Sequence, residues 1–223
     1  MFNTAIDGHV SSGKSTIAKG LAQALGIKVL DTGAIYRGLA CAFKAQGYNN
    51  INQQNMTEFI NKIKTVKIAF EDNIQKVIVN DVDYTDKLRL EEISMTSAQI
   101  APYKQLREKV RKIQQNFAEK NDCIMEGRDI GTEVLPKADF KFFVTASEEV
   151  RAKRRFEQIK NNPNPPTYEE VLKDLRERDF ADEHRKVAPL KPAKESIIID
   201  TTNQTLEQTI NLCLKIIRQK SIK

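Results

Sequence analysis

The sequence predicts an α/β fold in which a parallel β-sheet is flanked by helices. Three observations favour this class. Short apolar runs typical of buried strands occur near both ends of the chain. Segments with apolar residues at helical spacing follow them, and such alternation is typical of parallel strands joined by crossover helices. A glycine-rich segment links the first predicted strand directly to the first predicted helix.

The amino-terminal third supplies two strand–helix pairs. Residues 2–6 form an apolar run that ends at an Asp-Gly pair, which predicts a buried strand. A helix is expected from Ser15, with Gly26 as its carboxyl-terminal cap. A second short strand is expected at 29–30, and a second helix at 34–44 that stops by Gly47.

The middle of the chain has a different character. Three short β-type runs at 66–70, 74–79 and 82–84 predict a small antiparallel meander. A helix is expected from Pro102. Its predicted core face consists of residues at helical spacing: Leu106, Val110, Ile113 and Phe117.

The carboxyl-terminal half returns to alternating strands and helices. Strands are expected at 123–125, 140–144 and 197–199, and a helix is expected to open at Ser147. After a Pro/Asn-rich linker at 161–166, Thr167 and Glu170 form a capping box for a helix running towards Phe180. A closing helix follows Thr205. Its predicted apolar side consists of Leu206, Ile210, Cys213, Leu214 and Ile217. The core is therefore expected to be a parallel sheet that carries two insertions.

Composition and charge narrow the class of protein. The 223 residues carry a net charge of +6, with a pI of about 9.1. Segments 101–120 and 211–223 each carry +4 but few aromatics, which disfavours a nucleic-acid platform. No apolar run reaches the ~18 residues of a membrane helix, and no signal peptide is expected. The three cysteines are scattered, which disfavours a disulfide framework or zinc site and favours the cytoplasm.

A phosphate-binding loop is predicted where the first strand meets the first helix. The residues that fit the pattern G-x-x-x-x-G-K-[ST] are Gly8, His9, Val10, Ser11, Ser12, Gly13, Lys14, Ser15 and Thr16. Glycines in such a loop let successive backbone N–H groups turn towards phosphate oxygens, and the helix amino terminus adds its positive dipole end. The alternative is a Gly/Ser-rich turn that matches by chance, which the strand before it and the helix after it disfavour.

The side chains of this loop indicate a nucleoside triphosphate. Lys14 can reach the β- and γ-phosphates, and the Ser15 hydroxyl suits Mg²⁺. A GTPase should also carry an N-K-x-D clamp, which residues 61–64 lack. Glu126 follows a predicted strand and could contact Mg²⁺ through water, although an acid at a strand end is often only a cap. The length and the two insertions favour a small-molecule kinase over an ATPase motor.

Besides the phosphate loop, four further segments carry motifs whose residues have the chemistry that a nucleotide-binding site needs. They are residues 31–37 (DTGAIYR), 126–132 (EGRDIGT), 178–185 (RDFADEHR) and 187–192 (VAPLKP). Together with the loop, they resemble the bacterial cytidylate (CMP) kinase family of nucleoside monophosphate kinases. The resemblance extends from the first strand to about Asp200. It implies a P-loop NTPase-type core with a monophosphate-binding insertion and a helical lid.

The resemblance also implies the reaction and the site. Mg·ATP would donate its γ-phosphoryl group to CMP or dCMP. Lys14, Arg128, Arg178 and Arg185 would be catalytic, with Arg178 as a mobile lid arginine. Thr32, Arg37, Arg128 and Arg185 would hold the CMP phosphate. Arg107 and Asp129 would contact cytosine, Asp182 the sugar hydroxyls, and Tyr36 would line the acceptor site. The partners would be the small molecules ATP and CMP or dCMP, with no nucleic acid and no membrane.

The domain organisation follows from the same resemblance. One kinase domain over 1–223 is expected, acting as a monomer, with a core of 1–36, 101–155 and 187–223. The monophosphate-binding insertion is expected at about 37–100 and the lid at about 156–186. On the lid helix, Arg178, Asp182 and Arg185 are four and three residues apart, so all three can project into one cleft.

The sequence alone leaves alternatives open. Arg178, Asp182 and Arg185 could form a salt-bridge ladder on a solvated helix, Arg128 and Asp129 a simple turn ion pair, and Arg107 part of a solvated face. His9 and His184 are expected to be surface or loop residues. The rival functions are a UMP- or AMP-preferring kinase and a nucleotide-dependent RNA-binding or switch protein.

The sequence departs from the family pattern at three places. The family usually has Asp where this chain has Glu126, and Ser where it has Ala98. Ser97 could take over the role of that Ser. In the phosphate loop, His9 and Val10 replace the usual Pro and a small residue. These two positions act through their backbone, so the loop is expected to tolerate the change.

Overall fold

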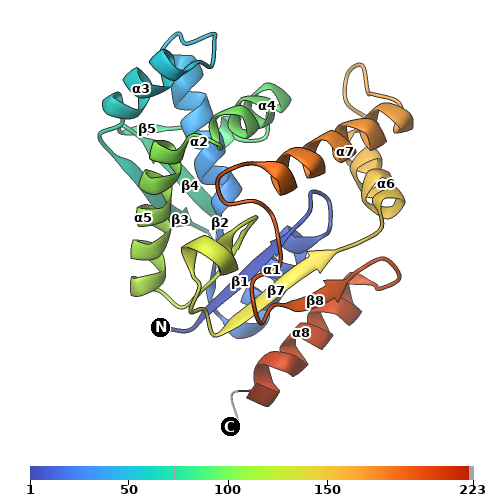
Figure 1. Cartoon of the computed structure of the whole chain (residues 1–223). Helices are drawn as coiled ribbons and strands as arrows, with labels where there is room; N and C mark the ends of the chain where they lie inside the picture. The colour runs from blue at the N-terminus through green and yellow to red at the C-terminus, as the bar shows by residue number, and fades with distance from the viewer. Residues whose placement is uncertain (73, 221–223) are drawn as a thin grey trace. The chain divides into compact units, whose positions relative to one another are not determined.

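The computed structural model describes residues 1–72 and 74–220, so the last three residues of the basic tail lie outside the described residues. The chain divides into two compact units (Figure 1). Unit 1 comprises Met1–Val29 and Asp122–Lys223, and unit 2 comprises Leu30–Asn121. Within the described part of the chain, no helix is long and apolar enough to cross a membrane.

The main sheet has five strands in the order β2-β6-β1-β7-β8. Four of them lie in unit 1: β1 (Asn3–Gly8), β6 (Cys123–Gly127), β7 (Phe140–Thr145) and β8 (Ile197–Asp200). The fifth, β2 (Lys28–Asp31), lies where the chain passes from one unit to the other. The pairings β1–β6, β1–β7 and β7–β8 are all parallel. The predicted parallel sheet is confirmed.

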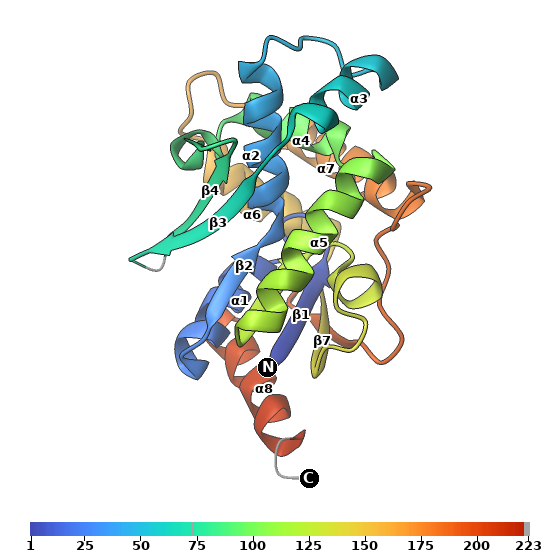
Figure 2. The same ribbon diagram turned by 90° about the vertical axis from the view of Figure 1, so that its left-hand side faces the viewer.

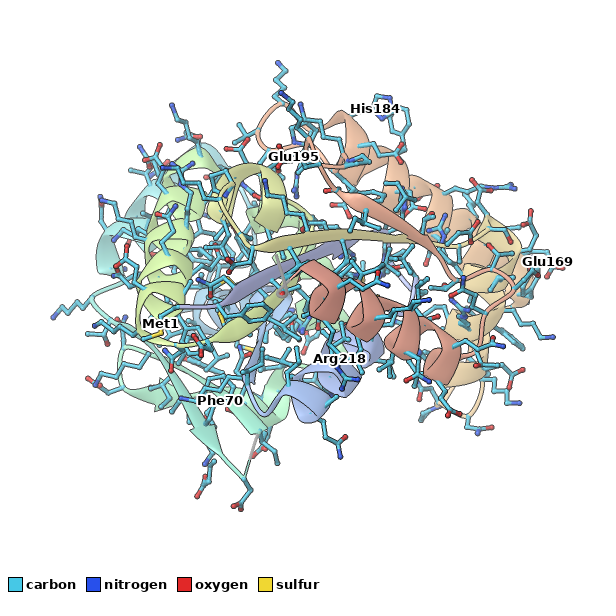
Figure 3. All side chains as sticks on the ribbon, turned by 90° about the horizontal axis from the view of Figure 1, so that it is seen from below. Met1, Phe70, Glu169, His184, Glu195 and Arg218 are labelled. Carbon is cyan, nitrogen blue, oxygen red and sulfur yellow. The ribbon has the colours of Figure 1, made fainter. Side chains whose placement is uncertain are left out.

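The helices of unit 1 begin and end largely where local signals predict. They are α1 (Lys14–Leu25), α6 (Glu148–Ile159), α7 (Tyr168–His184) and α8 (Leu206–Lys220). Gly26 ends α1 with a φ of 66°, Ser147 caps α6, and Thr167 with Glu170 forms the capping box of α7. Helix α7 continues past Phe180 to His184. Figure 1 shows it beside α6, and Figure 3 labels Glu169 and His184 at its two ends.

The core of unit 1 lies where α1 and α8 pack on the sheet. Ile6 and Val144 are fully buried, and Leu21 of α1 and Cys213 of α8 pack with them. The two helices approach closely at Gly20, where a Cβ would lie only 2.2 Å from Cδ1 of Ile210. The absence of a side chain at Gly20 permits this contact. Leu206 was predicted to belong to this apolar side, but its side chain is 46% exposed. It is the first residue of α8.

Unit 2 combines helices with the predicted antiparallel meander (Figure 2). Its elements are α2 (Thr32–Ala45), α3 (Gln53–Lys62), β3 (Val66–Glu71), β4 (Ile74–Val79), β5 (Val82–Asp83), a 3₁₀ turn (Thr85–Lys87), α4 (Glu91–Ile100) and α5 (Lys104–Lys120). The sheet order is β3-β4-β5. Helix α2 packs on β4 and α4, and its Gly38 permits the contact, since a Cβ there would lie 2.4 Å from the side chain of Val77.

Two details of unit 2 differ from expectation. Helices α3 and α4 were not predicted. On α5, Leu106 and Val110 are buried as expected, but Ile113 and Phe117 are only partly buried. The buried stripe instead continues through Gln114 and Ala118, and the Phe117 ring packs against Phe70 at 5.6 Å.

Candidate active site

The phosphate loop lies between β1 and α1, and its backbone adopts conformations that require small residues. Gly8 has a φ of 152°, and a Cβ there would lie 2.0 Å from the carbonyl oxygen of Val144 on β7. Gly13 has a φ of 93°, and Ser11 is left-handed at 57°. Such alternation turns backbone N–H groups to one side, which makes a concave site for an anion. The predicted loop therefore has the geometry that phosphate binding needs.

The two polar side chains at the start of α1 have identified partners. Lys14 is 8% exposed, and its Nζ donates to the carbonyl oxygen of His9 at 3.1 Å. Ser15 Oγ donates to Oε2 of Glu126 at 2.5 Å. Glu126 is buried on β6, the strand adjacent to β1. The structure thus brings together the hydroxyl and the carboxylate that were predicted to contact magnesium.

Two arginines of α6 support the phosphate loop and were not anticipated. Arg151 is 4% exposed. Its Nε donates to the carbonyl of Ala146 at 3.0 Å, and its Nη1 donates to Val10 O at 3.4 Å and to Asp179 Oδ2 at 2.5 Å. Arg154 donates through Nη1 to the carbonyl of Ser12 at 3.4 Å. Both arginines therefore hold backbone carbonyls of the loop in place, and Asp179 fixes Arg151 from α7.

All four strands of unit 1 contribute to this site from their carboxyl ends. The loop follows β1, Arg128 follows β6, and α6 follows β7. Thr201, directly after β8, accepts a bond from Arg154 Nη1 at 2.9 Å and donates to Ser12 O at 3.0 Å. The carboxyl ends of parallel strands are the usual place for ligand sites in open α/β sheets.

His9 links the phosphate loop to α7. Its Nε2 lies 2.8 Å from Oε1 of Glu183, and its ring meets the edge of Phe143 at 5.6 Å between centroids. The side chain is 16% exposed, and the residue lies in the loop between β1 and α1, within the expectation of a surface or loop position. His184 is exposed and stacks on Phe180, as expected of a surface residue. The pairing of His9 could not be inferred because its partner lies 174 positions away.

A cluster of charged side chains joins the segment after β6 to the end of α7. Arg128 Nε donates to Asp182 Oδ2 at 2.8 Å, and Arg185 Nη1 lies 3.6 Å from Asp182 Oδ1. Arg185 Nη2 lies 3.9 Å from Asp129 Oδ1. The side chain of Arg185 is only 10% exposed, which rules out a solvated ladder for this pair. Arg178, one helical turn before Asp182, is partly buried.

The electrostatics of this cluster keep Arg128 charged. Burial alone would lower the pKa of its guanidinium, but the charge of Asp182 and the hydrogen bond to it act in the opposite direction. The pKa is raised on balance. Arg128 and Arg185 thus share the carboxylate of Asp182, which is 25% exposed, and Arg185 also faces Asp129. Guanidinium groups placed side by side can bind a phosphate through charge-assisted hydrogen bonds.

Asp7, the residue before the loop, anchors the segment that carries Arg128 and Asp129. Its Oδ1 accepts from the backbone N–H of Ile130 at 2.8 Å, and its Oδ2 accepts from Gly131 at 2.7 Å. Burial raises the pKa of this carboxyl to about 6, against the lowering effect of the two backbone bonds. The neighbouring charge of Asp129 adds to the rise, and that of Arg128 opposes it.

This pKa predicts a pH-dependent stability. A carboxyl with a raised pKa in the folded state stabilises the fold at low pH, and this contribution is lost as the pH rises through about 6. The shift corresponds to about 3 kcal/mol. The unmodified protein should lose this stability as the pH rises, whereas Asp7→Asn should not. We therefore expect the difference in unfolding free energy between the two proteins to shift in favour of Asp7→Asn by up to that amount between pH 4 and pH 7.5, as measured by urea denaturation.

The matched control for this measurement is Asp139→Asn. Asp139 also accepts a backbone N–H, that of Asn3 at 2.7 Å, but the bond is exposed. Its difference from the unmodified protein should change much less over the same pH range. In Asp7→Asn, the amide N–H₂ faces a backbone N–H, so one hydrogen bond is lost. The variant can therefore be less stable than the unmodified protein at every pH. A constant difference between Asp7→Asn and the unmodified protein would contradict the prediction.

Unit 2 holds the other predicted site residues, mainly on α2. Thr32 is its first residue and is buried, and Tyr36 and Arg37 lie about one turn further on. Arg37 Nη2 donates to Oδ2 of Asp31 at 2.6 Å. Arg107 on α5 is 8% exposed, and its guanidinium lies 5.8 Å from the centre of the Tyr36 ring. The alternative that Arg107 belongs to a solvated face is therefore wrong.

One position that departs from the family pattern, Ala98, lies on α4. Ala98 is exposed there, and the neighbouring Ser97 is partly buried. Ser97 Oγ donates to the carbonyl of Ser94 at 2.8 Å within the same helix.

Comparison with known proteins decides the family. A family model described as cytidylate kinase matches residues 4–219. The chain belongs to the cytidylate kinase family. The cytidylate kinase of Clostridium tetani (strain Massachusetts / E88) is 40% identical over 219 residues, covering 98% of this chain and 95% of that protein. The cytidylate kinase of Thermotoga neapolitana is 38% identical and covers 98% of each.

The predicted family is thereby confirmed. The predicted fold class is confirmed too: the chain has the α/β P-loop kinase fold, with a five-stranded sheet and a small three-stranded antiparallel insertion. Among solved structures, an uncharacterized protein from Eubacterium ventriosum ATCC 27560 is 12% identical with a TM-score of 0.50, covering 98% of this chain and 99% of that one. At that identity the likeness concerns the fold alone.

Proposed function

We propose that this chain transfers the γ-phosphoryl group of ATP to the 5′-phosphate of CMP or dCMP, giving ADP and the diphosphate. Membership of the cytidylate kinase family implies the use of ATP. The observation that carries the proposal is the arrangement within unit 1, where a complete phosphate loop and the Arg128–Asp182–Arg185 cluster both lie at the carboxyl ends of the strands.

The chemistry needs no general base, because the attacking atom is already an anionic phosphate oxygen. The difficulty is to bring two anions together and to stabilise charge on the transferred group. In the proposal, backbone N–H groups of residues 8–16 hold the triphosphate. Lys14 exchanges its bond to His9 O for the β- and γ-phosphates. Arg128, Arg178 and Arg185 neutralise charge around the transferred group.

We propose that residues of each unit, taken separately, bind parts of the acceptor nucleotide. In unit 1, Arg128 and Arg185 bind the acceptor phosphate, Asp129 the cytosine edge and Asp182 the sugar hydroxyls. In unit 2, Thr32 and Arg37 bind the phosphate, Arg107 the base, and Tyr36 lines the site. Support comes from the contacts already described: Asp182 touches Arg128 and Arg185, and Arg107 lies near Tyr36.

Magnesium fits the residues present. Ser15 Oγ and Glu126 Oε2 are hard oxygen donors 2.5 Å apart beside the phosphate loop. Among the residues that the structure describes, no group of three or more His, Cys, Asp or Glu side chains could hold a metal alone. Mg²⁺ usually takes one or two protein oxygens together with substrate phosphates and water, which matches this pair. When bound, the ion would neutralise charge on the β- and γ-phosphate oxygens.

The proposal also covers the two insertions, the cellular compartment and the oligomeric state. The segment of about 37–100 would form the monophosphate-binding insertion, which carries Arg37, and about 156–186 would close as a lid that limits ATP hydrolysis by water. Three free, buried cysteines support a reducing, cytoplasmic setting. A single copy would suffice for the reaction, and sedimentation at working concentration would reveal a larger assembly.

One assay tests the function. ADP release is measured with Mg·ATP and each of CMP, dCMP, UMP and AMP. We expect kcat/KM for CMP and dCMP to exceed the values for UMP and AMP. Equal values for all four would remove the cytidylate assignment but keep the kinase class. A clear preference for UMP would implicate Ala98. Absence of any acceptor-dependent turnover, with salt-sensitive RNA binding, would favour a nucleotide-dependent RNA-binding protein.

A further inference from the structure

In unit 2, the side-chain amide of Gln75 on β4 bonds at both of its ends to the backbone of Asp31. Its Oε1 accepts from Asp31 N at 2.8 Å, and its Nε2 donates to Asp31 O at 3.0 Å. The two residues are 44 positions apart. The pair of bonds fixes both the donor and the acceptor of Asp31, as a neighbouring strand would. Asp31 is thereby tied to the meander immediately before α2 begins.

The side chain of Asp31 in turn fixes Arg37. Oδ1 caps the helix by accepting from Ala34 N at 2.9 Å, and Oδ2 accepts from Arg37 Nη2 at 2.6 Å. Both carboxylate oxygens are therefore engaged, and the guanidinium is held from one side. Gly33 leaves the space for this contact, since a Cβ there would lie 3.0 Å from Arg37 Nη1 and 3.1 Å from Asp31 Oδ1.

The strand that carries Gln75 is itself well anchored. β4 pairs with β3 over six residues, from Val79 opposite Val66 to Ile74 opposite Glu71. Val77 is fully buried and packs against α2 at Gly38. Gln75 therefore acts from a fixed platform on the residue that orients Arg37. An arginine carries several rotatable bonds, and holding it in advance reduces the entropy lost when it binds a ligand.

We propose that Gln75 is a positioning residue, which holds Asp31 so that Asp31 aims the guanidinium of Arg37 at the phosphate of the acceptor nucleotide. The inference rests on the proposed function, because it takes Arg37 to be a ligand of that phosphate. The alternative is a purely structural clip that joins β4 to the start of α2. The two differ in whether the effect of Gln75 passes through Arg37.

Kinetics with a double-mutant cycle separates these alternatives. Gln75→Leu removes both hydrogen bonds at similar volume, and Gln75→Glu keeps the acceptor but loses the donor. Because small misplacements of binding groups have large kinetic costs, we expect Gln75→Leu to raise KM for CMP about 10-fold and to leave KM for ATP unchanged. Gln75→Glu sets a carboxylate oxygen against Asp31 O, so it should raise KM for CMP at least as much as Gln75→Leu. In an Arg37→Ala background, Gln75→Leu should change KM for CMP less than about 2-fold.

The control is Lys67→Met, an exposed position on β3 of the same meander, which should behave as the unmodified protein. Thermal unfolding of every variant records any loss of stability. An unchanged KM for CMP in Gln75→Leu would overturn the proposal. So would an equal effect of Gln75→Leu with and without Arg37, or a parallel rise in both KM values, since either would identify a structural clip.

A second readout does not depend on the acceptor. The ¹⁵N NMR signals of the Arg37 guanidinium, assigned by their loss in Arg37→Lys, report how freely the group rotates. We expect hindered rotation in the unmodified protein and faster rotation in Gln75→Leu. Unchanged rotation would overturn the positioning role whatever the acceptor is. If rotation responds but no nucleotide monophosphate is phosphorylated, the positioning role stands and the proposed function is wrong.

Discussion

Replacing Lys14 with methionine is expected to lower kcat for CMP phosphorylation about 10³-fold. The ammonium group is the only positive side chain within the phosphate-loop sequence, and in the proposed mechanism it stabilises the charge that develops on the transferred group. Loss of one such preorganised group typically costs about 10²–10³ in kcat, and more for a full charge on phosphate. The side chain is 8% exposed, and methionine fills the same space, so the fold should survive.

Single-turnover kinetics with saturating Mg·ATP and CMP measures this loss directly. Lys19→Met is the matched control, since Lys19 lies on the same helix but is exposed, and it should retain nearly full activity. Circular dichroism and urea denaturation establish that both variants are folded. A Lys14→Met variant that keeps more than a tenth of the activity would show that this lysine does not take part in phosphoryl transfer.

Replacing Arg185 with alanine is expected to lower kcat/KM for CMP about 10²-fold, mainly through KM, with KM for ATP little changed. The guanidinium is 10% exposed and lies near the carboxylates of Asp182 and Asp129. Its removal takes away one of two arginines that share Asp182, so less positive charge remains for a phosphate. A charge-assisted bond to phosphate in a partly buried setting is worth about 3 kcal/mol, which corresponds to this factor.

The experiment compares full kinetics for Arg185→Ala, Arg185→Lys and Arg218→Ala. Arg185→Lys should recover only part of the loss, because an ammonium group cannot form two parallel bonds to one phosphate. Arg218, labelled in Figure 3, is an exposed arginine on α8, and its loss should leave turnover unchanged. An equal loss of kcat/KM in Arg185→Ala and Arg218→Ala would show that the acceptor site does not lie at Arg185.

Local sequence signals were sufficient for much of the fold and for the phosphate loop. Gly26 ends α1, and Thr167 with Glu170 opens α7, because caps depend on residues within one turn. The loop was predictable for a similar reason, since its glycines and Lys14 act within nine consecutive residues. Helix α3 was missed because it is mostly polar, and only Met56, Phe59 and Ile60 are buried.

The supporting contacts of the site could not be predicted from spacing. Arg151 meets the loop at Val10, 141 positions away, and Asp7 accepts from Ile130, 123 positions away. Gln75 lies in a strand whose pattern indicates only a meander. These contacts form because tertiary packing brings distant strand ends together, and one sequence without aligned relatives carries no record of that proximity. The motifs that contain the arginines, and the partner Asp182, could be recognised in the sequence, but Arg151, Asp7 and Gln75 could not be recognised as supports.

The polarity of the sheet also determines where a fluorophore or a surface linker can be attached without reaching the phosphate loop. Its amino ends are bonded together on the edge away from the loop, with Phe2 N donating to Asp122 Oδ1 and Asp139 N donating to Asn3 O. Met1 extends from this edge and is 73% exposed. The six residues of β1 span about 20 Å. A fluorophore or surface linker attached at this position would therefore stay well clear of the phosphate loop, which suits immobilised or single-molecule measurements.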